Sequence, residues 1–391
     1  MRQELDRRGM AYLSGGHTFT DMGQGAIPAL LPFLREDRGY SFAALSALVL
    51  AATVSSSIVQ PLFGAASDRR SLPWLMPGGL LLTGVGIGLA GIAPNYALTF
   101  AAIALSGLGV AAFHPEASRF ANYVSGARRA TGMSLFSVGG NAGFALGPIV
   151  VTPLVLVFGL PGMLVAGLLP VLMAVVLARE LPRLEAFRPG HGMARAATAA
   201  RAVPDQWGPF TRLAAAIGVR SAVYFGLATF VPLYFVTELE ASKADANAAL
   251  TVMLVAGAAG TLIGGRLADR IGRRPVFAVS TLSLTPLILA FLAADRTLAV
   301  VLLALIGAMI IATFSVTVVM GQEYLPNRIG VASGVTLGLA IGVGGVGSSA
   351  LGVLADRTGL ETVMYVIAFT PLLAAALALS LPRALTAVVA R

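Results

Sequence analysis

Twelve long apolar stretches follow one another along this chain, separated for the most part by short polar connections. A helix needs about 20 predominantly apolar residues to cross a bilayer, and each stretch comes close to that length or exceeds it. Strands of a membrane barrel would alternate between apolar and polar residues, which these stretches do not. We therefore predict an all-α membrane protein with twelve transmembrane helices, of which the first is unusually polar and the eleventh unusually rich in glycine. The predicted spans are residues 11–34, 43–66, 73–93, 97–117, 131–157, 161–180, 212–237, 246–267, 275–294, 298–320, 331–355 and 361–381.

The composition excludes the other large classes of protein. Hydrophobic residues make up 57% of the chain and charged residues only 12%, whereas an ordinary soluble domain has about 25% charged residues. A soluble enzyme, a disordered chain and a nucleic-acid-binding factor are therefore excluded. The net charge of +9 does not indicate nucleic acid, because the arginines lie in short runs between apolar stretches. The predicted surroundings are a lipid bilayer.

Side chains that could hold a metal ion or a cofactor are scarce. The chain has no cysteine, and its three histidines, His17, His114 and His191, lie far apart in the sequence. Their spacing matches no metal-binding motif. Residues 342–347 match the dinucleotide pattern G-x-G-x-x-G, but they lie in an apolar stretch with no strand before them. We therefore expect neither a metal site nor a cofactor.

Basic residues indicate how the spans cross the membrane. Most of the 27 Lys and Arg residues fall in the connections that share a side with the N-terminus. Basic residues are enriched in cytoplasmic connections. This bias predicts that both termini are cytoplasmic in a bacterial-type inner membrane. The N-terminal segment leads into a full-length span, so we expect that span to be retained rather than cleaved as a signal peptide.

The chain reads as two related halves. The predicted division is an N-terminal six-helix half at 1–180, a cytoplasmic linker at 181–211 and a C-terminal six-helix half at 212–391. QPLFGAASDRR, ending at Arg70, and TLIGGRLADRIGRR, ending at Arg274, occupy equivalent places after the second span of each half. Two halves related in this way predict a substrate path between them.

These features resemble the major facilitator superfamily of secondary transporters. The duplicated G-x-x-x-D-R-x-G-R-R loop carries the resemblance: the second copy, Gly265 to Arg274, fits fully, and the first, Gly64 to Arg70, is truncated. GGHTFTDMGQGAIPALLPFL, GVAAFHPEASR and MSLFSVGGNAGFALGP are similar to the fosmidomycin-resistance branch of drug exporters. The resemblance implies the major facilitator fold and proton-driven export of a small molecule.

Two polar residues in the first span are candidates for proton coupling. His17 and Asp21 are four residues apart, so they share one face of a helix. An ionisable residue inside a span is costly and indicates function by default. Burial favours the neutral carboxyl group and a nearby cation favours the charged one. The alternative is that the pair only hydrogen-bonds within the bundle.

Arg220 is the one basic residue inside a span, and it should face Asp21 across a central cavity. A guanidinium suits planar anions such as a carboxylate or a phosphonate. Tyr224 follows one turn later, and we expect Asn141 and Gln24 to line the same cavity. The alternative for Arg220 is a side chain that extends to the membrane surface.

Charged residues at the inner ends of the spans are candidates for a gate. Pairs formed between the two halves would hold the inner mouth shut and break when it opens. The resemblance implies such a latch at Asp68 and Asp269, whereas the alternative is solvated charge that only sets topology. The candidate gate residues are Asp68, Arg69, Glu116, Arg119, Asp269, Arg270, Arg273, Glu323 and Arg328. For His114, next to this group, a hydrogen bond at a helix end is the favoured interpretation.

Small residues in the fifth and eleventh spans predict close helix packing. The residues that we expect to carry it are Gly143, Gly147, Pro148, Gly342 and Gly345. Pro148 is also expected to bend its span.

The sequence as a whole predicts a secondary active transporter that acts by alternating access. The favoured function is proton-coupled antiport that exports a small organic solute or drug, of the kind that confers antibiotic resistance. The alternative is a proton-coupled importer of a small anionic solute, because fold does not fix direction. An enzyme is not expected, since neither G-x-S-x-G nor H-E-x-x-H occurs. The expected partners are the solute, protons and lipid, and the expected state is a monomer.

Overall fold

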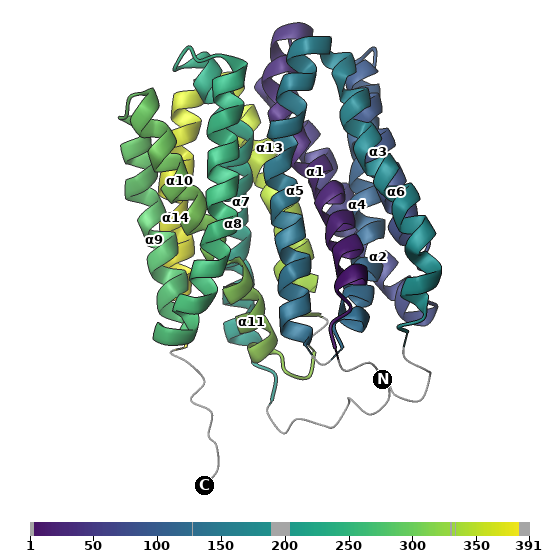
Figure 1. The fold of residues 1–391 in the computed structure, drawn as a ribbon. Coiled ribbons are helices and arrows are strands. Elements are labelled where there is room, and N and C mark those ends of the chain that lie inside the picture. Colours follow the sequence, from purple (N-terminus) through teal and green to yellow (C-terminus); the bar gives the residue numbers. More distant parts are fainter. Residues whose placement is uncertain (1–3, 127, 189–203, 329–330, 333, 383–391) are drawn as a thin grey trace.

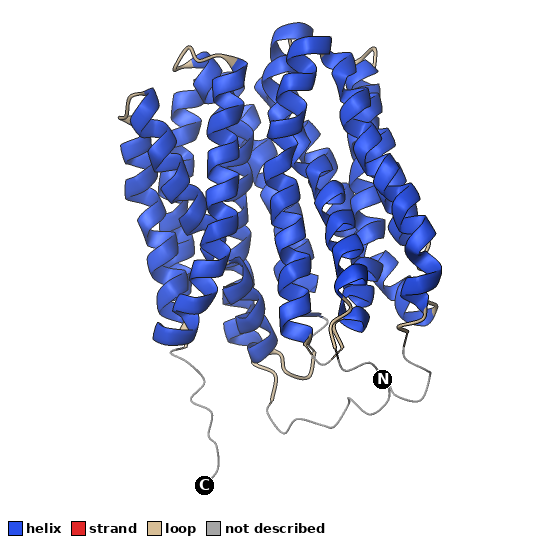
Figure 2. Ribbon diagram, viewed as in Figure 1, coloured by secondary structure: helices blue, strands red, loops and turns tan. Residues whose placement is uncertain are grey.

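The computed structural model describes residues 4–126, 128–188, 204–328, 331–332 and 334–382. These residues are almost entirely helical and contain no strand (Figure 2). The first half contains α1 (Arg7–Arg38), α2 (Phe42–Arg69), α3 (Leu75–Ile92), α4 (Tyr96–Val124), α5 (Arg129–Phe158), the short η1 (Leu160–Gly162) and α6 (Met163–Glu185). The second contains α7 (Trp207–Thr237), α8 (Lys243–Ile271), α9 (Arg273–Leu292), α10 (Arg296–Ala312), α11 (Phe314–Tyr324), the π-helical η3 (Gly334–Leu339), α13 (Ala340–Thr358) and α14 (Leu360–Leu379).

Eleven segments of the described chain are long and apolar enough to span a membrane. In that count α10 and α11 form one segment, and η3 and α13 form another. The polar α1 falls outside the count although it is 32 residues long. With α1 included, the twelve helices predicted from the sequence are present.

Several boundaries differ from those predicted. Helix α6 continues to Glu185 and α7 begins at Trp207, so the helices extend beyond the predicted limits of the linker at 180 and 212. The tenth span is not one continuous helix, because α10 ends at Ala312 and α11 begins at Phe314. Most of the linker lies outside the described residues.

Polar side chains fix where many of the helices begin. The carboxylate of Asp6 accepts a hydrogen bond from Gly9 N at the start of α1, and Ser41 and Asn95 cap α2 and α4 in the same way. These side chains satisfy backbone N–H groups that have no partner within a helix. Gly39, with φ of 65°, ends α1 in the left-handed region that glycine adopts without strain.

The two halves pack in the same pattern (Figure 1). In the first half α1 packs on α5, α2 on α4, and α3 on both α4 and α6. The second half repeats these pairs as α7 on α13, α8 on α10, and α9 on both α10 and α14. Between the halves α2 packs on α13 and α5 on α8, which are equivalent pairs under this symmetry. Helices α1 and α7 therefore lie at the centre of the bundle.

The ends of the bundle differ in how firmly the halves are joined. We call the end where α1 begins and α14 stops the near end, and the end with the turn between α1 and α2 the far end. Toward the far end, hydrogen bonds and an ion pair join the two halves. Asp356 of α13 accepts from Phe42 N at 2.8 Å and from Ala43 N at 3.0 Å, at the start of α2. Lys243 of α8 pairs with Glu36 of α1 at 2.8 Å.

A third far-end contact joins three helices. Asn247 Nδ2 of α8 donates to Ala29 O of α1 at 3.0 Å and to Thr152 Oγ1 of α5 at 2.9 Å. Asn247 is buried, so these hydrogen bonds are made away from water. The far end is therefore held by one buried contact, at Asn247, and by more exposed contacts at Asp356 and between Lys243 and Glu36.

Candidate functional site

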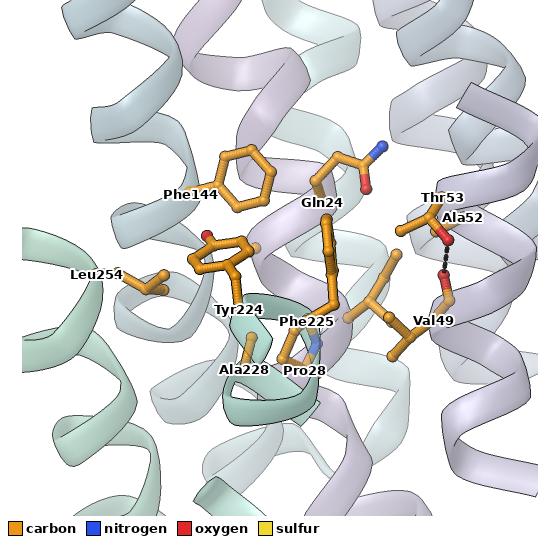
Figure 3. Close-up of a pocket in the computed structure, with 12 residues that line it drawn as sticks. Gln24, Pro28, Val49, Ala52, Thr53, Phe144, Tyr224, Phe225, Ala228 and Leu254 are labelled. Carbon is orange, nitrogen blue, oxygen red and sulfur yellow. Dashed lines mark hydrogen bonds between the residues drawn. The ribbon is translucent and has the colours of Figure 1, made fainter. Parts of the chain in front are cut away.

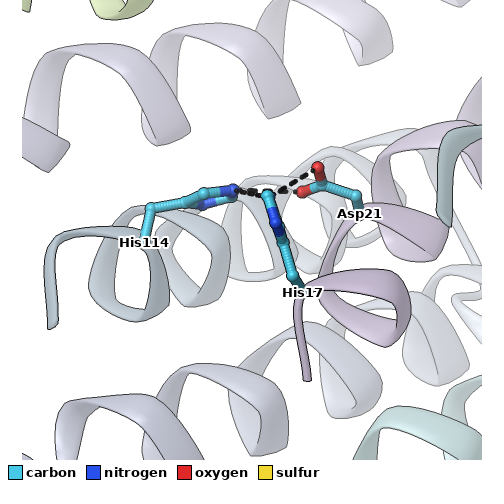
Figure 4. A group of neighbouring side chains, drawn as sticks. All are labelled: His17, Asp21 and His114. Carbon is cyan, nitrogen blue, oxygen red and sulfur yellow. Dashed lines mark hydrogen bonds and ion pairs between the residues drawn. The ribbon is translucent and has the colours of Figure 1, made fainter. Parts of the chain in front are cut away.

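Three ionisable side chains converge inside the first half (Figure 4). His17 and Asp21 come from α1, one turn apart, and His114 comes from α4. His17 Nε2 lies 3.2 Å from Asp21 Oδ2, and His114 Nε2 lies 3.3 Å from Asp21 Oδ1. The two Nε2 atoms are 3.0 Å apart. The histidines were expected to be too far apart to share a site. This was wrong for His17 and His114: they are distant in the sequence, but α1 packs on α4 and brings their side chains together.

The backbone fixes the orientation of both imidazole rings. His17 Nδ1 lies 2.7 Å from Phe136 O of α5, and His114 Nδ1 lies 2.8 Å from Val110 O. A carbonyl oxygen only accepts hydrogen bonds, so each Nδ1 carries the proton and donates it. Each Nε2 therefore points into the cluster. His114 was expected to form a hydrogen bond at a helix end; it lies instead inside α4, where its Nδ1 bonds Val110 O and its Nε2 contacts Asp21, which the sequence did not predict.

Helix α5 holds the cluster from one side. The His17 ring stacks on Phe136 with centroids 4.1 Å apart. Gly140 lies beside the cluster, and a Cβ atom there would stand 2.6 Å from His17 Nε2 and 2.7 Å from Asp21 Oδ2. Since both contacts would be too short, the absence of a side chain at Gly140 creates the space that the cluster occupies.

Glycines bring helices together at two interfaces. A Cβ on Gly143 would lie 2.9 Å from Met22 N of α1, and Gly147 faces Gly25 of the same helix. Helix α5 continues through Pro148 without interruption. Across the halves, Gly342 and Gly345 of α13 lie against Ser57 and Thr53 of α2.

A small cavity lies between the halves, one turn beyond Asp21 along α1 (Figure 3). Five helices contribute to it: α1, α2 and α5 of the first half, and α7 and α8 of the second. Its walls are mainly apolar, with a few polar groups. The lining residues are Gln24, Gly25, Ile27, Pro28, Val49, Ala52, Thr53, Phe144, Tyr224, Phe225, Ala228 and Leu254. Gln24 and Tyr224 therefore line the cavity as predicted, whereas Asn141 and Arg220 are not among its lining residues.

Arg220 lies deep in the second half, one turn before Tyr224 on α7. It is 4% exposed, and its Nη1 donates to Ile310 O of α10 at 2.9 Å. Among the described residues no carboxylate pairs with it, and its Nε has no hydrogen-bond partner. The ion pair between Arg220 and Asp21 that the sequence allowed is not made, because the guanidinium turns toward the end of α10 and Asp21 toward the histidines.

At the near end, two of the predicted gate residues, Glu116 and Glu323, make contacts within their own halves. Glu116 is fully buried; its Oε1 accepts from Leu72 N at 2.6 Å and lies 3.8 Å from Arg119. The equivalent residue of the second half, Glu323, pairs with Arg273 at 2.5 Å. Glu116, inside α4, thus ties the fourth span to the connection before α3, and Glu323, near the end of α11, ties it to the first residue of α9.

Among the other gate candidates, those with described side chains show no ion pair between the halves. Arg328 pairs with Asp205 at 3.3 Å, within the second half. Asp269 and Arg270 are exposed, and no ion pair is found for them in the described part of the chain. Asp68 and Arg69 end α2, but their side chains lie outside the described residues. With the halves joined at the far end, the described near-end groups find their partners locally.

Sequence reasoning missed the groups that do join the halves. Asp356, Glu36, Lys243 and Asn247 all belong to the far end, whereas the gate was expected at the basic near end. A signal for Asp356 was present, because it lies in an Asp-Arg pair at the end of an apolar span. Nothing in the sequence places that pair beside the start of α2.

A family model described as Major Facilitator Superfamily matches residues 13–338 of the chain. The chain belongs to the major facilitator superfamily. The predicted fold is thereby confirmed, and with it the prediction of a membrane transporter rather than an enzyme.

Two curated members of the superfamily are similar along most of their length. The fosmidomycin resistance protein of Escherichia coli (strain K12) is 33% identical over 368 residues, covering 92% of this chain and 89% of its own. An uncharacterized MFS-type transporter of Bacillus subtilis (strain 168), YfnC, is 35% identical over 365 residues, covering 91% and 88%. The resemblance to the fosmidomycin-resistance branch is therefore confirmed.

Solved structures of other superfamily transporters share the fold. A bacterial homologue of the human lysosomal transporter Spinster, in an inward-facing and unoccupied conformation, gives a TM-score of 0.80 at 15% identity, with 95% of each chain covered. A point mutant of the nucleoside transporter NupG gives 0.77 at 14% identity, covering 95% of this chain and 99% of that one. At these identities the likeness concerns the fold alone.

Proposed function

We propose that this major facilitator transporter is a proton-coupled exporter of a small organic solute that carries an anionic group. The two halves rock about the central cavity and open it to one side of the membrane at a time. The path lies within one chain, so a monomer suffices. The similarity to a fosmidomycin resistance protein supports a drug-like solute, including a phosphonate.

The observation that carries this proposal is the buried guanidinium of Arg220. A buried charge without a counter-charge is costly, and Arg220 has no carboxylate partner among the described residues. An anionic group of the solute would supply that partner. Tyr224 and Gln24 offer polar contacts in the adjoining cavity, and Asn141 of α5 is assigned to the same binding role on its sequence position alone.

The proton is assigned to Asp21, with His17 beside it. Both are buried on α1, Asp21 one turn and His17 two turns from the cavity, so a change in their charge would alter the electrostatic potential where the solute binds. Intramembrane carboxylates and histidines are the groups from which proton relays are built. The two imidazoles and the carboxylate lie close enough to exchange a proton directly.

The near end is assigned to the cytoplasm, in a bacterial-type inner membrane, because most of the basic residues lie on that side. When the near end closes, the charged groups there come together and latch the halves. Asp68 and Asp269 are the acceptors of this latch, and the arginines around them are the donors. Closure of the far end in the present conformation supports a cavity that opens toward the near end.

The test is transport in proteoliposomes with an imposed pH gradient and a trapped fluorescent pH reporter. Wild type should show a proton flux that depends on a phosphonate or another anionic drug. The flux should vanish in Asp21→Asn, while Arg220→Gln should raise the KM for the solute more than about tenfold, as loss of a charge-assisted hydrogen bond predicts. The sign of the flux separates export from import. Full coupling in Asp21→Asn would refute the assigned proton site.

A further inference from the structure

We propose that His17, Asp21 and His114 form a binding site for a divalent transition-metal ion of the zinc type. The proposal concerns the same three side chains as the proton assignment but goes beyond it. It rests on the direction in which the three groups point, on the distances between them and on the space beside them (Figure 4).

The three groups present only acceptors to one another. Both Nδ1 atoms donate to backbone carbonyls, of Phe136 and Val110, so both Nε2 atoms of the neutral rings carry lone pairs. The carboxylate of Asp21 likewise offers lone pairs. Acceptors held about 3 Å apart repel each other unless a positive centre lies between them. A positive centre between the three groups removes this repulsion: either a proton on one Nε2, or a metal ion, which is the occupant that we infer here.

The distances suit a metal ion. Zinc binds nitrogen at about 2.0–2.1 Å in a tetrahedral site, and neighbouring ligand atoms of such a site are about 3.3 Å apart. The Nε2–Nε2 separation of 3.0 Å is close to that edge, and the distances of 3.2 and 3.3 Å run to Oδ2 and Oδ1 of Asp21, so the carboxylate would face the ion with both oxygens. Two imidazoles and one carboxylate suit zinc, iron, cobalt or nickel better than magnesium or calcium, which prefer oxygen ligands.

The surroundings are those of a built metal site. Metal-binding histidines usually donate their second ring nitrogen to a carbonyl or carboxylate, which fixes the tautomer and the ring. Both histidines do so here, and the stacking on Phe136 fixes His17 further. Gly140 leaves one side of the cluster without a side chain. His114 is the most exposed of the three, with 20% of its side chain accessible, and provides the entry path.

A metal ion bound here would take the place of the coupling proton. Zinc should therefore inhibit transport, and the site would make the transporter sensitive to metal ions. The proposal does not depend on the direction of transport or on the solute.

The test is a titration of the purified full-length protein, without a histidine tag, with Co²⁺ at fixed pH. Wild type should bind one Co²⁺ per chain, with the visible absorption of nitrogen-ligated cobalt, and Zn²⁺ should displace it. His114→Ala should weaken binding at least about 100-fold, because loss of a ligand exceeds the effect of losing an outer hydrogen bond. His191→Ala removes the one histidine outside the cluster and is the matched control, with unchanged binding.

A second variant keeps all three ligands. Gly140→Ala places a methyl group against His17 Nε2 and should also weaken Co²⁺ binding, which covers the case that His114→Ala does not fold. Absence of Co²⁺ binding in wild type, or equal binding in the folded variants, would overturn the proposal. Proton flux without Co²⁺ binding would leave the transport proposal standing, and Co²⁺ binding without proton flux would leave only the metal site.

Discussion

Single residues in equivalent places of the two halves have different environments, and Glu116 and Glu323 illustrate this best. Glu116 lies inside α4 and binds the connection before α3, whereas Glu323 lies near the end of α11 and binds the first residue of α9. Glu116 is fully buried and receives a backbone N–H group, whereas the side chain of Glu323 is 44% exposed and receives an arginine. Burial decides what each contact contributes, because exposed ion pairs are weak and buried polar groups are costly to leave unpaired.

We expect Glu116→Ala to lower the free energy of unfolding by about 1–3 kcal/mol, because Leu72 N and Arg119 lose a buried acceptor. Glu323→Ala should cost less than about 1 kcal/mol, as for other exposed pairs. Glu116→Gln keeps an acceptor and should fall between wild type and Glu116→Ala. Thermal unfolding of the purified variants in detergent measures the order. Equal losses at the two positions would contradict it.

Between elements, the contact of Asp356 with the start of α2 resembles a helix cap but joins two halves of the molecule. A carboxylate at a helix N-terminus meets free N–H groups and the positive end of the helix dipole. Asp295 caps α10 in the same manner, but within its own half. Asp356 both caps a helix and joins the halves, whereas Asp295 only caps a helix. Comparing variants of the two residues therefore distinguishes the two effects.

Asp356→Ala should raise the fraction of molecules with an open far end by about tenfold, since a lost cap costs about 0.5–2 kcal/mol. Asp295→Ala should leave that fraction unchanged. The chain has no cysteine, so Ser46→Cys, buried where α2 meets α13, can report on opening through its rate of reaction with a thiol reagent. A similar rate in both variants would show that Asp356 does not hold the far end closed.

At the scale of the whole molecule, alternating access requires the far end to separate during each cycle. A covalent link between the halves there should therefore stop transport. Thr152 and Asn247 are suitable positions, because their side chains touch across the interface at 2.9 Å.

The double variant Thr152→Cys/Asn247→Cys should lose transport after reaction with a short thiol cross-linker and recover it on reduction. Thr229→Cys/Ser348→Cys is the matched control: these side chains touch at 2.8 Å, but both belong to the second half. Cross-linking the control should leave solute flux in proteoliposomes unchanged. Undiminished flux in the cross-linked first variant would exclude opening at that end.

The sequence predicted the number of helices, the division into halves and the polar face of α1, because span length and helical period are local properties. It did not predict the meeting of His17 with His114, which depends on how α1 packs against α4. The predicted direction of the Arg220 side chain, toward the central cavity, was wrong for the same reason. The depth of a residue in the membrane can be counted along its helix, but which neighbouring helix its side chain faces depends on tertiary packing. The break between α10 and α11 was also not predicted, because no proline in this stretch indicates it.

The polarity of α1 has a consequence for how the protein is made. A segment with His17 and Asp21 at its centre partitions poorly from the translocon into lipid by itself. The groups that shield these side chains belong to α4 and α5, which leave the ribosome about a hundred residues later. Helix α1 must therefore be held at the translocon, or enter the bilayer only provisionally, until α5 has been synthesised and can pack against it.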